Sequence, residues 1–580
     1  MERQCPCCQH TNPASLTECP RCGALLSDTA PATAPDMSMI HPIVDDGPAA
    51  LELDDNEQRY RAAEARFRAN QQDVAALEVM LQAAEALADP IRVSRCLATL
   101  SQVVQAPPTK ADYLIRAAIV TRDQRGEAHK AAAGFRAALD HDPTRLDAFL
   151  ALTEYYASQE NWTALEGIYR FMIEKHSTLA QPNRLVLNKL WRKLGALLSD
   201  PIGRHQEAVL ALETASRFAP EDIKNHATLF EIYQRWPGHE AQACAALNEV
   251  VLLEPDPQAQ LRAMRALASF YQQQEDDDAL FCTLRALAFL GEASPQESAW
   301  VEETRRKVPK IPEAAISHQL WREAVYTRNF PYDIARLLSL LAHAVGTRLE
   351  NDLDTFDVTL RDRLDPEQPL LLNTLVNRIC RIFGIAVPPE IYLKDEVAGL
   401  GMINGVLNPA GFLVARSLLS GHGAAELAFI VAKRLAMLKE DFYLAGISPA
   451  QDIELFLMGA TKHCRPNAPI TMSRDLEWII KAIKSRLDPA RLSELEKLIE
   501  GILTQQQTFS LESYFNQVDQ IANRLAFLLS DSLDVAADII VADKNASGTL
   551  NADQRLDLLV RYSVSSEYLA LRKALNLVIA

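Results

Sequence analysis

Residues 131–143 read Ala131-Ala-Ala-Gly-Phe135-Arg-Ala-Ala138-Leu-Asp-His-Asp-Pro143. The offsets +4 and +3 place Ala131, Phe135 and Ala138 on one face of a helix, and Pro143 cannot continue that helix. The same offsets recur twice further along the chain, at Ala208, Leu212, Ala215 and Pro220 and at Ala243, Leu247, Val250 and Pro255. Small residues let two helices approach closely, and the larger residue between them fills the space toward a neighbouring hairpin. The pattern therefore predicts stacked helical hairpins.

A second set of recurring positions marks the first helix of each hairpin. Leu165, Tyr169 and Met172 hold the places of the first pattern with bulkier side chains. The first-helix positions recur at Leu152 and Tyr156, at Leu194, Gly195 and Leu198, at Leu229 and Tyr233, and at Leu267 and Tyr271. The spacing of about 34 residues resembles tetratricopeptide (TPR) repeats. The resemblance covers residues 58–308 and implies a right-handed α-solenoid that binds protein partners in a concave groove. An irregular helical bundle is the alternative. Tyr156, Tyr233 and Tyr271 are interpreted as interior packing positions rather than ligand contacts.

Five of the ten cysteines lie within the first 22 residues. Cys5-Pro-Cys7-Cys8 and Cys19-Pro-Arg-Cys22 form two short knuckles that can direct four thiolates at one ion. The spacing predicts a zinc ribbon over residues 1–27 with Cys5, Cys8, Cys19 and Cys22 as ligands of one structural Zn²⁺, and Cys7 as a spare thiol. A redox or metal-free role is the alternative. Four thiolates close the coordination shell, so we expect this zinc not to be catalytic.

The segment 28–57 is rich in proline, alanine and aspartate and lacks aromatic residues, which is typical of a flexible acidic linker. The formal net charge of the whole chain is −17. This charge argues against a general nucleic-acid or anionic-membrane binder. No apolar run reaches the roughly 20 residues that span a bilayer, and the N-terminus has no signal-peptide core. We therefore expect a cytoplasmic protein, and the sequence leaves its oligomeric state and the identity of its partners open.

Residues 313–580 lack the repeat pattern and are predicted to be mostly helical, with a short hairpin-like sheet. The segments Ile391-Tyr-Leu393 and Phe412-Leu-Val-Ala415 have the character of strands, and a helix follows them. The order of strand, asparagine-containing loop and strand before Glu426-Leu-Ala-Phe-Ile-Val-Ala432 resembles HtpX-like and CAAX-prenyl-protease zinc endopeptidases. In that family the next residues form a His-Glu-x-x-His motif, whose two imidazoles bind zinc and whose glutamate is the general base.

This chain departs from the family motif at each of its key positions. Lys433 and Met437 stand at the two histidine positions, and Arg434 stands at the glutamate position. The third ligand of the family is a glutamate on a later helix, for which Asp519, followed by Asn523, is the best counterpart. A lysine ammonium would repel a divalent cation, so the resemblance implies a peptidase-like domain without catalysis. An unrelated helical domain is the alternative.

One further motif lies at Asp543–Gln554, which matches part of an EF-hand calcium loop. Position 12 of the loop is Gln554, which lacks the bidentate carboxylate that supplies much of the calcium affinity. A polar loop between helices, turning at Gly548, is the alternative. The predicted function is a non-catalytic interaction scaffold. The other hypotheses are a metallopeptidase with atypical ligands and a nucleic-acid-associated factor directed by the zinc ribbon.

Overall fold

The computed structural model describes residues 2–4, 11–13, 55–307, 312, 314–405, 410–504, 510–544 and 546–579. About 71% of the chain is helical, and the described residues contain 26 α-helices and a three-stranded sheet. The predicted fold class, mainly α with a small sheet in the C-terminal part, is confirmed. The structure divides into two compact units, residues 1–246 (unit 1) and 247–580 (unit 2). The predicted solenoid range, 58–308, runs through both units, and the predicted domain ranges stay predictions.

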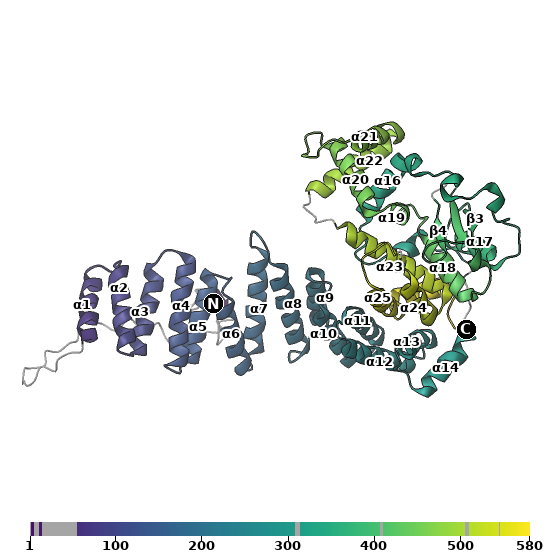
Figure 1. The fold of residues 1–580 in the computed structure, drawn as a ribbon. Coiled ribbons are helices and arrows are strands. Elements are labelled where there is room, and N and C mark those ends of the chain that lie inside the picture. The colour runs from purple at the N-terminus through teal and green to yellow at the C-terminus, as the bar shows by residue number, and fades with distance from the viewer. Residues whose placement is uncertain are drawn as a thin grey trace, which may run out of the picture. The chain divides into compact units, whose positions relative to one another are not determined.

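Unit 1 is an array of antiparallel helices, which stand side by side in a row in Figure 1. Two short strands, β1 (Glu2–Gln4) and β2 (Thr11–Pro13), pair antiparallel near the N-terminus. The helices are α1 (Asp55–Ala69), α2 (Val74–Ala86), α3 (Pro90–Val103), α4 (Pro107–Asp123), α5 (Ala128–His141), α6 (Leu146–Ser158), α7 (Trp162–Ser177), α8 (Arg184–Ser199), α9 (His205–Phe218), α10 (Ile223–Arg235) and the first part of α11 (Glu240–Leu253).

The residues that predicted the hairpins form the interior of this array. Ala131, Phe135 and Ala138 are buried on α5, and the helix ends before Pro143. Side-chain caps start many of the helices: Asn161, for example, accepts a hydrogen bond from the backbone N–H of Ala164. These local signals agree with one another, and the helical repeat array is confirmed.

Close helix packing within a hairpin depends on glycine at two positions. A Cβ atom added at Gly195 on α8 would lie 2.7 Å from Cγ of Leu212 on α9. A Cβ atom added at Gly134 on α5 would lie 3.1 Å from Cβ of Ala118 on α4. Gly195 and Leu212 are both members of the recurring sequence pattern. The pattern therefore identified two positions, one on each helix, that come into close contact in the hairpin.

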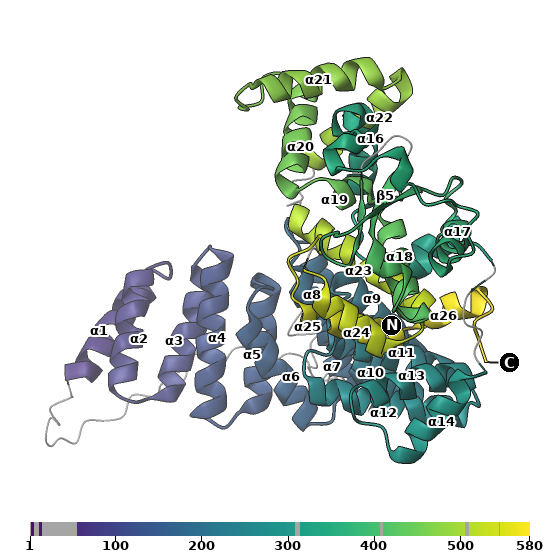
Figure 2. The same cartoon turned by 45° about the vertical axis from the view of Figure 1, so that its right-hand side comes forward.

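Unit 2 begins within α11 and contains the sheet. Its helices are α12 (Pro257–Gln273), α13 (Asp277–Phe289), α14 (Pro295–Arg305), α15 (His318–Leu320), α16 (Tyr332–Leu349), α17 (Leu371–Phe383), α18 (Ala424–Ala436), α19 (Tyr443–Ile447), α20 (Ala450–Cys464), α21 (Arg474–Arg486), α22 (Pro489–Thr504), α23 (Leu511–Ser530), α24 (Leu533–Ala542), α25 (Ala552–Ser563) and α26 (Ser566–Ala574). Short π- and 3₁₀-helical turns cover Trp321–Val325, Leu353–Phe356, Leu360–Asp362 and Arg416–Leu419. Figures 1 and 2 show α20, α21 and α22 gathered around α16 at one end of this unit.

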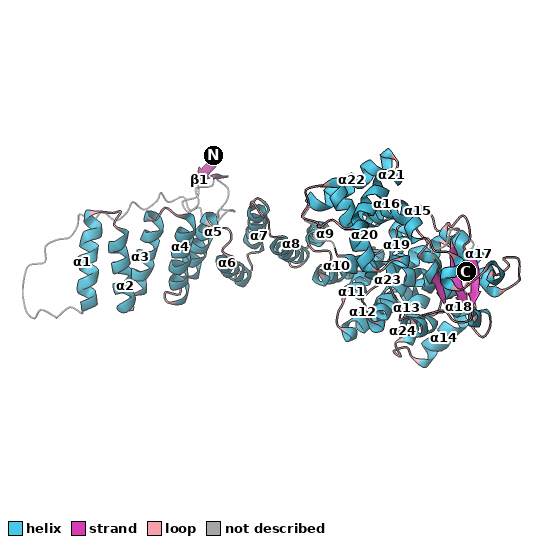
Figure 3. Cartoon of the chain, turned by 45° about the horizontal axis from the view of Figure 1, so that its top comes forward, coloured by secondary structure: helices cyan, strands magenta, loops and turns pink. Residues whose placement is uncertain are grey.

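The sheet has the strand order β3 (Glu390–Lys394), β5 (Gly411–Ala415), β4 (Met402–Asn404). Figure 3 shows it beside α17 and α18. The two predicted strands are confirmed, but the hairpin-like pairing is wrong because β3 and β5 run parallel. Strand β4, which the sequence analysis did not predict, lies in the connection and pairs antiparallel with β5. The connection between the predicted strands is long enough to return the chain, so a parallel pairing is possible.

The C-terminal helix α26 is held to α13 by buried charges. Arg572 on α26 donates to both carboxylate oxygens of Asp278, at 2.8 and 3.1 Å. Arg285 on α13 contacts Asp531, at the end of α23, and its guanidinium lies 4.9 Å from the ring centroid of Phe527. Buried arginines need such partners because their charge cannot be removed. These contacts group α13 with the C-terminal helices of unit 2.

Candidate functional site

The predicted zinc ligands Cys5, Cys8, Cys19 and Cys22, and the spare Cys7, lie outside the described residues. The zinc ribbon therefore stays a prediction from the spacing of these cysteines. Within the part of the chain that the structure describes, no group of three or more His, Cys, Asp and Glu side chains is arranged to hold a metal ion.

The helix predicted to carry the peptidase-like motif is α18. It begins after Gly423, and all of the run from Glu426 to Ala432 lies within it. Its apolar side chains Leu427, Ile430, Val431 and Leu435 are buried. Helix α18 packs along α23 and also contacts α17 and α24. This packing carries Lys433 into the interior of unit 2.

Lys433 lies at the centre of a buried cluster of polar side chains. Its Nζ atom is 2.7 Å from Oδ2 of Asp543 and 3.0 Å from Oδ1 of Asp519, and it donates a 2.8 Å hydrogen bond to Oδ1 of Asn523. Only 1% of the Lys433 residue is exposed. Three oxygen atoms thus surround an ammonium group that has three N–H donors.

Two arginines complete the cluster. Arg434 Nη2 lies 3.6 Å from Oδ1 of Asp543, and Arg555 Nη1 lies 3.9 Å from Oδ2 of Asp519. Arg555 also donates to the carbonyl oxygen of Ile540 at 2.9 Å. Burial by itself would raise the pKa of Asp543, but Lys433, Arg434 and Arg555 outweigh it and hold that pKa below its ordinary value. The charged residues form a network of two carboxylates and three cations.

Lys433, Arg434 and Met437, which the resemblance aligns with the zinc-peptidase motif, take part in ion pairing and packing. Lys433 fills the space between two carboxylates, and Met437, at the end of α18, is buried. Asp519, the counterpart that the resemblance suggests for the third ligand, and Asn523, one turn further along α23, both face Lys433. Asn523 also donates to Oδ2 of Asp519 at 2.9 Å.

Asp543 and Arg555 were not predicted to be members of this cluster. The sequence places Asp543 only at the first position of the candidate calcium loop. The lysine within a largely apolar helix was the one indication of such a cluster, because a buried lysine requires nearby carboxylates. The lysine does not indicate which aspartates supply them.

The candidate calcium loop has protein partners at its important positions. The carboxylate of Asp543 contacts Lys433, and Gln554 exchanges hydrogen bonds with Asn551 in a capping box at the start of α25. Asn516 on α23 accepts a 2.7 Å hydrogen bond from the backbone N–H of Thr549. The described part of the loop is therefore packed as a polar connection between helices, and Asn545 lies outside the described residues.

The two histidines near the peptidase-like segment have separate partners. His422 Nδ1 lies 2.8 Å from Oε1 of Glu426, beside a cavity of about 520 Å³ between α18, α24 and the sheet. His463 Nε2 lies 3.4 Å from Oε1 of Glu496 on α22. They belong to different parts of unit 2, so they do not form a paired metal site.

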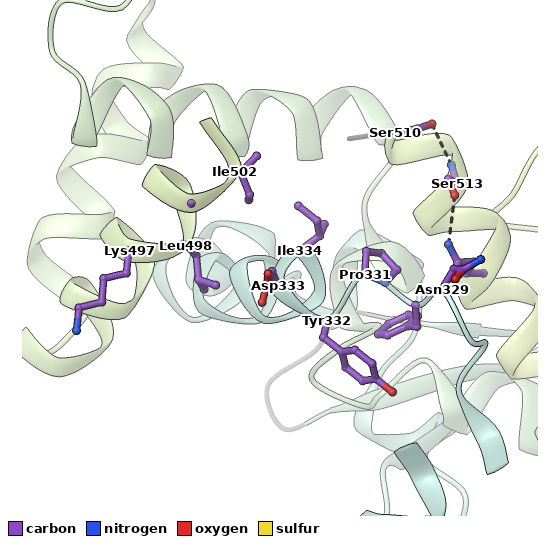
Figure 4. A pocket seen from close by; sticks show the side chains of 13 residues that line it. Asn329, Pro331, Tyr332, Asp333, Ile334, Lys497, Leu498, Ile502, Ser510 and Ser513 are labelled. Atoms are coloured by element: carbon purple, nitrogen blue, oxygen red, sulfur yellow. Dashed lines mark hydrogen bonds between the residues drawn. The ribbon is translucent and has the colours of Figure 1, made fainter. Parts of the chain in front are cut away.

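Two further cavities in unit 2 were not indicated by any sequence motif. The larger, of about 590 Å³, lies between the start of α16, the end of α22 and the start of α23. Figure 4 shows lining side chains from each of these elements: Tyr332 and Ile334 on α16, Leu498 and Ile502 on α22, and Ser510 just before α23. The other cavity, of about 500 Å³, is lined by Trp321, Lys439 and other residues, and the Lys439 ammonium lies 4.3 Å from the Trp321 ring centroid.

The surface of unit 1 exposes large apolar side chains on regular helices. Leu146 and Leu150 lie one turn apart on α6 and are 43% and 56% exposed, and Leu185 on α8 is 64% exposed. Tyr156, predicted to be interior, is buried, whereas Tyr233 is only partly buried. The array thus has a filled interior and outward-facing leucines.

The known structures include a structural neighbour of this chain. No protein-family model matches the sequence, and no curated protein matches it. The C-terminal part of a TPR repeat-containing protein from Cytophaga hutchinsonii is similar at 12% identity with a TM-score of 0.27, over 42% of this chain and 93% of that one. A TM-score of this size does not establish a common fold. Among the described residues, no helix is long and apolar enough to cross a membrane. The description as a helical repeat array therefore rests on the hairpins of the chain itself.

Proposed function

We propose that this protein is a non-catalytic interaction scaffold that binds protein partners on its helical repeat array. The outward-facing leucines on the regular helices of unit 1 carry the proposal. Leu146 and Leu150 present two apolar side chains on one helix face, and the hairpins behind them are well packed. A rigid helix face with apolar contacts is a common way to bind a partner segment at low entropic cost.

The Lys433 cluster supports the absence of peptidase activity. A zinc peptidase needs metal ligands and a general base, and Lys433, Arg434 and Met437 provide neither function. The ammonium group of Lys433 lies between two buried carboxylates, Asp519 and Asp543, where its charge balances theirs. In this proposal the cluster stabilises unit 2, and one structural zinc bound by Cys5, Cys8, Cys19 and Cys22 stabilises the N-terminal ribbon.

Metal analysis tests the non-catalytic part. We expect one zinc per full-length chain, and none in a variant that lacks residues 1–54. Neither protein should hydrolyse an unfolded protein substrate, with or without added zinc. Zinc that persists stoichiometrically in the shortened variant, together with hydrolysis that a chelator abolishes, would favour the alternative of a metallopeptidase with atypical ligands.

Partner binding tests the scaffold part. Chemical cross-linking of the full-length protein in a cell extract identifies candidate partners, and each purified candidate is then titrated against the full-length chain. We expect Leu146→Ser/Leu150→Ser to weaken binding about tenfold, a loss of about 1.4 kcal/mol. The matched control is Leu210→Ser on α9, which is similarly exposed. Equal binding by all three proteins would show that the face around Leu150 is not the interaction surface.

A further inference from the structure

Helix α8 has a charge opposite to that of the chain as a whole. Its sequence, Arg184-Leu-Val-Leu-Asn-Lys189-Leu-Trp-Arg192-Lys193-Leu-Gly-Ala-Leu-Leu-Ser199, contains four basic residues and no acidic residue. The chain carries a formal net charge of −17. Lysines at positions i and i+4, such as Lys189 and Lys193, repel each other and weaken an isolated helix. The basic character of α8 is therefore not explained by helix stability.

One row of side chains on α8 is used to hold the array together. Arg184, Asn188 and Arg192 are spaced four residues apart, so they lie on one face. Arg184 Nη2 donates to the carbonyl oxygen of Arg217 at the end of α9, at 3.2 Å. Asn188 and Arg192 both donate to Oδ2 of Asp222, at 2.6 and 2.5 Å. These bonds fix α8 against the turn between α9 and α10.

The neighbouring row on α8 faces outward. It consists of Leu185, Lys189 and Lys193, all exposed. Among the described residues, no carboxylate lies within ion-pair distance of Lys189 or Lys193, nor of Lys224 on α10, whose backbone N–H is bonded to Asp222. Leu185, Lys189, Lys193 and Lys224 are called the α8 face below.

Some arginines elsewhere in unit 1 are arranged differently. Arg145 contacts both Asp112 and Asp147, and Arg204 contacts both Glu166 and Glu207. Near the α8 face, the carboxylate of Asp222 is already bonded to Asn188 and Arg192. Glu221 is the one neighbouring exposed carboxylate in the α9–α10 turn, so the face keeps an excess of positive charge.

We propose that the α8 face binds an acidic segment of a protein partner, with Leu185 as its apolar contact. This inference rests on the proposed scaffold function and names the chemistry of its partner. Charge complementarity favours an acidic sequence, and the exposed leucine beside the lysines favours a segment that also carries apolar side chains. A nucleic acid is disfavoured, because the one aromatic residue of α8, Trp191, packs against the core and is not free to stack on a base.

Fluorescence anisotropy with the full-length protein tests the proposal. The probe is a labelled synthetic peptide composed of glutamate, aspartate and leucine. We expect saturable binding that weakens as salt rises from about 0.05 to about 0.3 M, because exposed charges are screened over a shorter distance. Lys189→Glu/Lys193→Glu should weaken binding at least about tenfold.

The matched control is Lys130→Glu/Lys175→Glu, which changes the net charge by the same amount on α5 and α7. The control should bind the acidic peptide nearly as well as the unchanged protein. The α8 variant should instead gain affinity for a peptide of lysine and leucine. Equal losses in both variants would mean that only net charge matters, and this would overturn the proposal.

Two more measurements keep the outcome decisive. If Lys189→Glu/Lys193→Glu lowers the unfolding midpoint, Lys189→Gln/Lys193→Gln removes the charge without adding a carboxylate. A labelled single-stranded RNA that binds the α8 face when the acidic peptide does not would overturn the proposal. A purified partner that is sensitive to Leu146→Ser/Leu150→Ser but not to the α8 variants would retain the scaffold function and reject this inference alone.

Discussion

The α8–α9 hairpin of unit 1 and the Lys433 cluster of unit 2 are both well packed, but they are built in opposite ways. Gly195 and Leu212 in the hairpin are close in sequence and belong to a pattern that recurs along the chain. Lys433 meets Asn523 across 90 residues, and its other partners come from α23 and the end of α24. A repeated local contact is visible in the sequence, whereas a single long-range contact between charged residues is not.

Loss of the central cation should have the largest effect. Lys433→Met keeps much of the side-chain volume but leaves Asp519 and Asp543 buried without their main counter-charge. We expect unit 2 to lose about 3–5 kcal/mol of stability, measured by urea unfolding. Lys189→Met, at an exposed position of α8, is the control and should change stability by less than about 0.5 kcal/mol. A similar small effect at both positions would show that the cluster does not stabilise unit 2.

Acid should weaken the same cluster, by less than the loss of Lys433. The folded pKa of Asp543 is below that of an unfolded aspartate, which is about 3.9. Its carboxylate therefore adds stability above that pH, and this stability is lost as the pH falls through the folded pKa. The free energy of unfolding should be measured from about pH 7 to about pH 3, a range that approaches the ordinary pKa of aspartate. It should fall more steeply with decreasing pH for the unchanged protein than for Asp543→Asn.

Asp222 offers the matching measurement in unit 1. Burial opposes ionisation at Asp222, but the bond from Asn188 and the nearby Arg192 still hold its pKa below the ordinary value. It is less buried than Asp543, so Asp222→Asn should alter the pH profile in the same direction and by a smaller amount. A larger effect from Asp222→Asn would reverse the comparison between the two regions.

Glycine in the hairpin gives a change of intermediate size. An exposed Gly→Ala change inside a helix usually adds up to about 1 kcal/mol of stability. Gly195→Ala should instead destabilise by about 1–3 kcal/mol, because the added Cβ would meet Leu212 at 2.7 Å. Gly346→Ala on α16 is the control, since no atom beyond its own helix backbone and its chain neighbours lies within 4 Å of the added Cβ. Differential scanning calorimetry should show shifts of opposite sign for the two variants.

A helix cap in the repeat array should give the smallest effect. Asn161→Ala removes the acceptor of the 3.0 Å bond from the Ala164 N–H at the start of α7. We expect a loss of about 1 kcal/mol in urea unfolding. Asn161→Asp retains an acceptor and should recover most of the stability. No difference between these two variants would assign the effect of Asn161→Ala to something other than the cap.

Much of the fold was predictable because the signals are local. The hairpin pattern predicted buried positions such as Ala131, Phe135 and Leu212, and the apolar spacing predicted α18 and the strand at Ile391–Leu393. The parallel pairing of β3 with β5 was not predictable from either strand alone. The pairing depends on how the chain between β3 and β5, which contains strand β4, folds back.

The candidate sites divide in the same way. The cysteine spacing predicts zinc ligands at Cys5, Cys8, Cys19 and Cys22, and this prediction awaits the metal measurement. The resemblance to zinc endopeptidases places Lys433 at a ligand position, but the sequence did not show that Asp543 and Arg555 surround it. The basic composition of α8 was present in the sequence, yet the bonds from Arg184, Asn188 and Arg192 decide which lysines face outward.

The sequence by itself determined the helical hairpins and two of the three strands of the sheet. Periodicity within a few tens of residues encodes these features, because backbone hydrogen bonds and apolar faces act over short separations. Only the tertiary structure decided the partners of Lys433, the order of the sheet and the outward row of α8. Those features depend on which distant helices pack together, since a buried charge requires a partner without specifying where in the chain it lies.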